Sequence, residues 1–569
     1  MPVTGGKMAQ AGHNQRDRSR DAGSGKHNGH GRRLWGCWPL VLGPVAGMFA
    51  LVWFLVRVIP KPSRATYPCQ RVAFQLASGF VAWLLGLTAS AAAHRRAGGL
   101  LRRSRYVAAG LCLAAAVLAV WWSMAATGRR VSAAFYPLDP PNSPMGIARG
   151  VNPGRVVWVR DANAVTWDGY SGNWWDEGSV SQEAVDKMVS DSIRWLAGKN
   201  SDAEAWDAIF RHFNESRGFG GTGYISAEKV AIKVNMNQDS GDAWSNGDGM
   251  PTPQVLYSVL KQLIDVVGVP GASITVYDAS RCIGDPLYNK IRSNTSADFQ
   301  QVRFVVNPEQ ARSGRAAAQA DTANPVHYAD PAVGYSGATY LPYCVTGARY
   351  IINMALFWGH DIAGITSLAK NHFGSVWHDV SSHSGWTPRH MHDSCDVHDR
   401  PMGSPNALVD LMGHRHLGGK TLLFMIDALY GHHYQGSGPI RFQSFGNDWC
   451  KSIFTSQDGV ALESVALDFL RNEPVCDDRV RGAVDNYLHE AALADSPPSG
   501  VFYDPEGDGT RLESLGVHEH WNNAADKQYS RNLGTGDGIE LVTSRPPPAV
   551  DFNKDGVVNF LDFAIFSEP

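Results

Sequence analysis

The chain has 569 residues and a formal net charge of −3, and this length predicts two to four structural units. Residues 1–130 contain 18 Lys and Arg residues against two acidic residues, whereas the remaining chain contains 33 basic and 52 acidic residues. Because an acidic body would repel nucleic-acid phosphates, nucleic acid is excluded as its partner. The eight cysteines include no C-x-x-C pair, so neither a zinc ribbon nor an iron–sulfur cluster is expected.

The N-terminal part of the chain predicts a membrane anchor. Residues 1–33 are rich in Gly, His, Asn, Ser and Arg and predict a disordered basic tail. Three apolar runs follow at 34–56, 72–93 and 106–128, and each is long enough as a helix to cross a hydrocarbon layer of about 30 Å. Lys and Arg are more frequent in the tail and the second loop than in the first loop, which places the chain after Gly128 outside. We therefore expect a membrane-embedded, multi-pass protein of the cell (inner) membrane with an extracytoplasmic body.

The body predicts an α/β domain over 155–530, between linkers at 131–154 and 531–550. Strands and helices alternate along it, so the expected fold class is α/β with a mixed, largely parallel sheet. This sheet body is expected to follow the three transmembrane helices and to precede a small calcium-loop appendage. The predicted helices are 181–198 and 252–268, and the predicted strands are 155–162, 229–237, 273–280, 301–307, 348–357 and 420–431.

Polar residues end several of the predicted strands. Ligands in such folds gather at the carboxyl ends of parallel strands, so these side chains could meet in one site. The alternative is that each of them only caps a loop. The residues are Lys233, Asn235, Asp278, Asn353 and Asp427.

Lys370 and Asn371 are the candidates for chemistry on an unknown ligand. A lysine in a dry pocket can act as a base, a nucleophile or an anion clamp, and Asn371 could orient a carbonyl or a carboxylate. With Lys233 added, the site would suit an anionic substrate, and Asp278 and Asp427 would serve as bases or as ion partners. The alternative is a buried ion pair that only positions strands. No G-x-S-x-G, H-E-x-x-H or P-loop motif is present.

Histidines are concentrated in the same region, since 11 of the 20 fall between positions 360 and 433. Imidazole is a good ligand for Zn, Fe, Ni or Cu, and an H-x-H pair on a strand places both rings on one face. The alternative is a solvated polar loop. The candidate transition-metal ligands are His360, His372, His390 and His392.

The body resembles the DUF362 family over about 229–472. The resemblance is carried by "VAIKVNMN", "ITVYDAS", "LLFMIDALYG" and above all a Gly-x-Thr-x-x-x-Lys-Asn-x-Phe-Gly core at 364–374. It singles out the pair Lys370–Asn371, but the family has no settled activity to transfer. Trp358 stands near where the family usually has a Lys, and Glu463 stands where it usually has an Asp. The chain also lacks the cysteines of the ferredoxin module that some members carry.

The C-terminus contains a calcium-loop pattern, "DFNKDGVVNFLD" at 551–562. Its spacing matches a Ca²⁺ loop, except that Asp replaces the usual Glu at the twelfth position. With the residues that follow, it resembles one repeat of a type I dockerin, in the segment 551–569. Dockerins normally have two repeats, so the single repeat argues against docking to a cohesin. The expected ligands are Asp551, Asn553, Asp555, Val557, Asn559 and Asp562.

Two functions of different classes follow. The first is an envelope-anchored enzyme, metal-assisted or not, that acts on an anionic or saccharide-linked small molecule. The second is a non-catalytic cell-surface binding or attachment protein, linked to polysaccharide degradation through its dockerin-like repeat.

Overall fold

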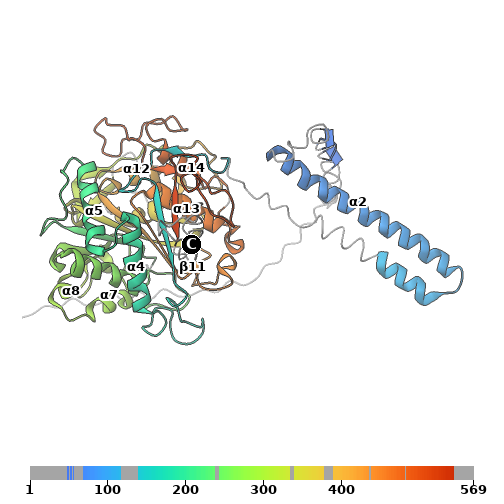
Figure 1. Ribbon diagram of the computed structural model, residues 1–569, viewed down its shortest axis with the longest axis horizontal. Helices are drawn as coiled ribbons and strands as arrows, with labels where there is room; N and C mark the ends of the chain where they lie inside the picture. The colour runs from blue at the N-terminus through green and yellow to red at the C-terminus, as the bar shows by residue number, and fades with distance from the viewer. Residues whose placement is uncertain are drawn as a thin grey trace, which may run out of the picture. The chain divides into compact units, whose positions relative to one another are not determined.

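The computed structural model describes residues 48–49, 51–53, 55–56, 68–116, 139–237, 243–333, 339–376, 389–434, 437–480 and 482–543. The chain divides into two compact units, residues 1–134 and 135–569 (Figure 1). The calcium loop at 551–562 and the dockerin-like segment as a whole lie outside the described residues.

The first unit contains helix α2 (Pro68–Leu101), a turn at 102–105 and a helical stretch over 106–116. Among the described residues, no helix is both long enough and apolar enough to cross a membrane. This finding contradicts the predicted three transmembrane helices and, with them, the multi-pass membrane location. In α2 the run at 72–93 ends in small residues, and the helix continues through the charged pair Arg95 and Arg96. Residues 34–47, 50, 54 and 117–128 of the other two runs lie outside the described residues.

The second unit is built on a ten-stranded sheet, which confirms the predicted mixed, largely parallel α/β body. Every neighbouring pair from β11 (Thr421–His432) to β6 (Ala316–Ala317) is parallel. β12 (Ser452–Ser456) runs antiparallel to both β11 and β2 (Arg155–Arg160). A tenth strand, β10 (Gly364–Thr366), folds back antiparallel on β9. The strands in sheet order are β14 (Glu540–Thr543), β2 (Arg155–Arg160), β12 (Ser452–Ser456), β11 (Thr421–His432), β9 (Tyr350–His360), β3 (Val230–Val234), β4 (Ile274–Asp278), β5 (Arg303–Val306) and β6 (Ala316–Ala317).

Two short pairings lie outside this sheet. β1 (Met145–Gly146) pairs with β13 (Val517–His518), and β7 (Ala320–Val326) pairs with β8 (Thr339–Pro342).

Helices cover both faces of the sheet. Successive residues of each strand point to opposite sides, so each face presents apolar side chains that the helices bury. Val157 and Ile232 belong to a core with α4 (Gln182–Ala197) and α5 (Asp202–Ser216). Val156, on the other side, belongs to a second core. The first core also holds α6 (Pro253–Lys261), α7 (Asp285–Arg292) and α8 (Ala297–Gln301), and Figure 1 shows most of these helices together. The second face is covered by α12 (Ala407–Gly413), α13 (Gly459–Arg471) and α14 (Asn486–Ala492). Three shorter helices complete the body: α9 (Tyr343–Thr346), α10 (Leu368–Asn371) and α11 (Arg389–Ser394).

Local sequence signals account for the helix ends. Ser181 caps α4 by accepting the hydrogen bond of Ala184 N, and Gly198 ends it in a left-handed conformation (φ 65°). Thr252 occupies the predicted N-cap position of α6 with Pro253 after it, but its side chain makes no capping hydrogen bond. Its backbone N–H donates instead to Asp427, 2.7 Å away.

Candidate functional site

Three adjacent parallel strands bring the predicted polar residues together. In the register of the sheet, Lys233 of β3 lies between Tyr277 of β4 and Asn353 of β9, and Asp278 is the next residue of β4. Ala231 and Tyr277 contribute to the smaller core on the second face of the sheet, and the alternation of β3 turns Lys233 to that same face. The segment 364–374 runs along this face.

Lys233 is an ammonium whose three protons are all used. Its Nζ donates to Asp278 Oδ2 (2.9 Å), Asn371 Oδ1 (2.8 Å) and its neighbour's carbonyl, Val234 O (2.6 Å). The side chain is fully buried, and burial lowers its pKa while the charge of Asp278 opposes that shift. The arrangement is a buried ion pair completed by hydrogen bonds, which corresponds to the positioning alternative for Lys233.

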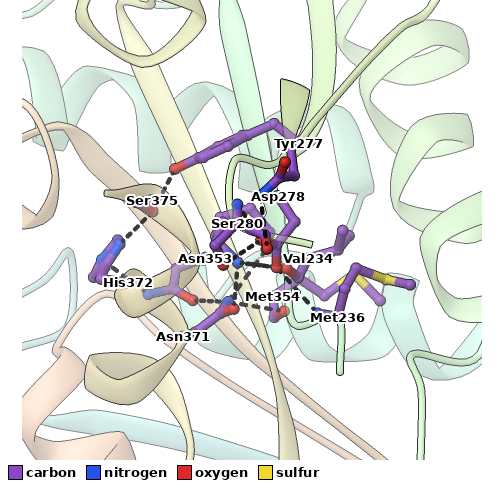
Figure 2. A network of polar contacts seen from close by, with 12 residues as sticks. Val234, Met236, Tyr277, Asp278, Ser280, Asn353, Met354, Asn371, His372 and Ser375 are labelled. Carbon is purple, nitrogen blue, oxygen red and sulfur yellow. Dashed lines mark hydrogen bonds and ion pairs between the residues drawn. The ribbon is translucent and has the colours of Figure 1, made fainter. Parts of the chain in front are cut away.

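Asn371 extends this network across the sheet (Figure 2). Its Nδ2 donates to Asn353 Oδ1 (2.8 Å) and to Met354 O (3.2 Å). Asn353 Nδ2 in turn donates to Leu368 O (2.9 Å) and lies 3.1 Å from His372 Nε2. Asn371 therefore fixes helix α10, and with it the neighbouring Lys370, to strands β3 and β9.

His372 is held as a neutral ring within the network. Because Asn353 Nδ2 is a donor, His372 Nε2 accepts, and the proton on Nδ1 is directed at Ser375 Oγ, 3.2 Å away. Burial lowers the pKa of His372 to about 3, in agreement with the neutral form. Ser375 Oγ lies 2.9 Å from Tyr277 OH, which closes the chain of contacts back to β4 (Figure 2). Both ring nitrogens are occupied, so His372 is not placed as a metal ligand.

Gly374 lies directly against the ion pair. A Cβ at this position would come within 2.6 Å of Asp278 Oδ1 and Oδ2 and of Lys233 Nζ. Its carbonyl accepts the N–H of Ala279 at 2.7 Å, which ties the segment to the end of β4. The close approach explains why this position of the core motif is a glycine.

Lys370 lies in a different environment from Lys233. Its Nζ is 2.9 Å from His392 Nε2 and 3.7 Å from the centre of the Phe373 ring. Burial lowers its pKa from the ordinary 10.5 to about 7, with a further lowering from the charge of Arg281. The amine is therefore close to half protonated at neutral pH.

Two of the predicted histidines adjoin Lys370. The rings of His360 and His392 stack with their centres 5.5 Å apart. His360 Nδ1 accepts the backbone N–H groups of Ile362 and Ala363, each at 3.0 Å. Burial holds the pKa of His360 well below its usual value, and the charges of Lys370, His392 and Arg479 act in the same direction. His390 lies in α11, and its side chain is outside the described residues. Within the described part of the chain, these histidines do not bring their ligand atoms together around one point.

Two buried acids lie beside the network without entering it. Asp427 accepts the N–H of Thr252 (2.7 Å) and of Leu429 (3.2 Å), and burial raises its pKa to about 6. Glu463 of α13 accepts the N–H of Ala369 at 3.1 Å, and burial raises its pKa to about 7. Asp427 thus holds the start of α6, whereas Glu463 holds α10 directly beside Lys370.

A group that could hold a metal ion lies elsewhere in the body. One donor atom each of Asp139, His518 and His520 lies within 4.8 Å of the others. The sequence signal for it is the H-x-H spacing in "GVHEHW", which is also the spacing of His390 and His392. The third residue, Asp139, is too distant in the chain to be paired with these two by spacing.

The family model described as "Domain of unknown function (DUF362)" matches residues 230–468. The match covers β3, β4, β9, α10 and most of α13, and with them Lys233, Lys370 and the residues hydrogen-bonded to either lysine side chain. No curated protein matches the chain.

Proposed function

We propose that the body is an enzyme that acts on an anionic substrate, with Lys370 as its general base. The observation that carries the proposal is an amine whose pKa is lowered to about 7 and whose Nζ lies 2.9 Å from His392 Nε2. A base with a pKa near the working pH can take up a proton and return it within one catalytic cycle. His392 is the adjacent group through which that proton can be exchanged.

The charge of the surroundings supports an anionic substrate. The charge of Arg281 lowers the pKa of both Lys233 and Lys370, so it adds positive charge near Lys370. Arg479 lowers the pKa of His360 and also pairs with Asp361 at 2.8 Å. A positive potential next to a half-protonated amine attracts a carboxylate or a phosphate and holds its acidic C–H or O–H close to the base.

Lys233, Asp278 and Asn371 then act as positioning residues. Lys233 has no proton or lone pair to spare, because all three of its N–H groups are donated. The bond from Lys233 to Asn371 fixes α10, which carries Lys370. Asp427 holds α6 rather than the reacting groups.

Solvent hydrogen exchange tests the proposal without a known substrate. The full chain is incubated in D₂O with keto acids, uronic acids and sugar phosphates, and loss of C–H signals is followed by NMR. We expect exchange in at least one of these compounds, with a rate that rises with pH through a midpoint near 7. Lys187→Arg is the matched control, because the Lys187 side chain is 68 % exposed and far less desolvated.

Lys370→Arg separates the possible roles of the lysine. Arginine keeps the positive charge but does not release its proton, so exchange should fall by at least about 100-fold while the compound still binds. Exchange that persists in Lys370→Arg would refute the general-base role. Binding without exchange in the unchanged chain would instead favour the second function, a protein that only binds its ligand.

We also propose that residues 551–562 bind Ca²⁺, which rests on the spacing of Asp551, Asn553, Asp555, Val557, Asn559 and Asp562 alone. Calcium titration of the full chain should show one site that is lost in the variant Asp551→Ala/Asp555→Ala. A titration curve unchanged by these substitutions would refute it. The alternative function, attachment at the cell surface, rests on this loop, which lies outside the described residues.

A further inference from the structure

Two distant segments of the body meet beside helices α13 and α14. β1 pairs antiparallel with β13, with Met145 opposite His518. The pairing brings the segment that starts at Asp139 next to residues 517–520, and both strands contact α14. Three histidines and three acidic side chains gather at this junction: His489, His518, His520, Asp139, Asp468 and Asp485.

The hydrogen bonds of His518 and His520 define which ring nitrogen faces the junction. Ser464 Oγ donates its single proton to Val460 O (2.7 Å), so it accepts from His518 Nδ1, also 2.7 Å away. Asp468 Oδ1 accepts from His520 Nδ1 at 2.7 Å. Both rings therefore carry a proton on Nδ1 and present Nε2 to the junction. Among the described residues, neither Nε2 atom has a hydrogen-bond partner, although both side chains are buried.

Carboxylate oxygens converge on the same place. Asp139 Oδ2 lies 2.5 Å from His489 Nε2 and 3.8 Å from His518 Nε2. Asp485 Oδ1 lies 3.7 Å from His520 Nε2. Asp139 Oδ2 and His489 Nε2 thus form an ion pair, whereas in the described part of the chain Asp485 Oδ1 has no hydrogen-bond partner.

A bound cation accounts for this arrangement. Buried polar atoms without partners are rare, and an imidazole lone pair that faces a carboxylate is repelled unless the ring takes up a second proton or a cation lies between the two groups. Imidazole nitrogens with carboxylate oxygens are ligands that suit divalent transition metals, and hydrogen bonds from Nδ1 to protein oxygens are what orients a metal-bound histidine. We propose that Asp139, His518 and His520 bind one divalent transition-metal ion, with His489 and Asp485 as additional donors.

The position of the site suggests what the ion does. It joins the segment that enters the body at Asp139 to the C-terminal segment around β13. Helix α13 connects the site to the region of Lys370. Its Glu463 accepts the N–H of Ala369, next to Lys370, and the following residue, Ser464, accepts from His518 of the site. The side chains of Asp139 and His489 are 18 % and 12 % exposed, so the ion can enter from their side.

A second H-x-H pair in the same body provides a matched control. His414 Nε2 lies 3.0 Å from Pro325 O, and His416 Nε2 lies 2.8 Å from Asn324 Oδ1. Here each Nε2 atom already has a protein partner. His416→Gln should therefore leave metal binding unchanged, although its sequence spacing is identical to that of His518 and His520.

The test uses the full chain, purified without a polyhistidine tag and analysed by inductively coupled plasma mass spectrometry. The stripped protein is then titrated with Co²⁺, whose visible absorption reports nitrogen and oxygen ligands, and Zn²⁺ is used as a competitor. We expect one tightly bound ion per chain and a Co²⁺ spectrum that Zn²⁺ removes. Asp139→Asn, at a partly exposed position, should weaken binding by at least about 100-fold, and Ser464→Ala by about 10- to 100-fold.

Circular dichroism of each variant separates loss of the site from loss of the fold. A folded Asp139→Asn variant with unchanged metal affinity would overturn the assignment of the ligands. A native chain that neither retains an ion nor gives a Co²⁺ spectrum would overturn the site itself and leave a network of ion pairs in its place.

Discussion

The buried ion pair between Lys233 and Asp278 gives the sharpest prediction about stability. Lys233→Met keeps much of the apolar stem but removes an ammonium that donates to Asp278, Asn371 and Val234. The buried Asp278 then keeps only three hydrogen bonds, from Met236 N (3.3 Å), Ser280 N (3.0 Å) and the Ser280 hydroxyl. Removing one partner of a buried pair costs about 3–5 kcal/mol. That is a change of about two to nearly four powers of ten in the unfolding equilibrium constant.

The assay is urea unfolding of the full chain, followed by tryptophan fluorescence of the body. Lys187→Met is the matched control, because Lys187 pairs with Asp191 on the surface of α4 and its side chain is 68 % exposed. We expect this control to change the unfolding free energy by less than about 1 kcal/mol.

A double variant separates the ion pair from the packing around it. Lys233→Met combined with Asp278→Leu removes both charges, and should recover much of the loss, since replacing both partners of a buried pair by apolar groups is often close to neutral. A cost below about 1 kcal/mol for Lys233→Met alone would refute the reasoning. It would mean that the amine is not the partner that keeps Asp278 in place.

Two further predictions concern the same segment, beside those already stated for Lys370 and for the metal ligands. Gly374→Ala should destabilise the body by about 1–3 kcal/mol in the same assay, because its Cβ would lie within 2.6 Å of a pinned ion pair; an unchanged midpoint would contradict the close packing. Glu463→Gln should stabilise the chain by up to about 3 kcal/mol at pH 8 and flatten its pH dependence, because burial raises the pKa of Glu463 from 4.5 to about 7. The stability that protonated Glu463 contributes is complete below its unfolded pKa and is lost as the pH rises from about 4.5 to about 7, so equal pH profiles for the two proteins would contradict this assignment.

The arrangement of strands could be predicted because buried parallel strands have a distinctive sequence. The run at 229–237 contains β3, and 273–280 contains β4, each bounded by polar residues that end the strand. From this pattern it followed that Lys233, Asp278 and Asn353 could meet, and the sheet places them side by side. The hydrogen-bond partners could not be read in advance, since they depend on how segment 364–374 lies on the sheet.

Asp427 shows where the strand-end argument was wrong. It lies within β11, whose register pairs Phe424 with Asn353, so Asp427 lies three residues further along the strand. There it accepts the N–H of Thr252, the N-cap residue of α6, and does not contact Lys233. Sequence patterns locate strands, but the stagger between neighbouring strands is set by the packing of the whole sheet.

The predicted membrane anchor was wrong, since no described helix is both long enough and apolar enough to cross a membrane. A run of uncharged residues does not fix where its helix ends, and α2 extends beyond the run at 72–93 through Arg95 and Arg96 to Leu101. The missed metal ligands show the opposite limitation. His518 and His520 were visible as a spaced pair, but Asp139 joins them only because β1 pairs with β13.

The pKa of the Lys370 amine tests the central claim most directly. It can be measured on the full chain by competitive acetylation over a range of pH, with each labelled lysine identified by mass spectrometry and exposed Lys187 as the internal reference. The structure predicts a midpoint near 7 for Lys370. A midpoint near the ordinary lysine value of 10.5 would contradict the account, because an amine that stays protonated at neutral pH cannot serve as its base.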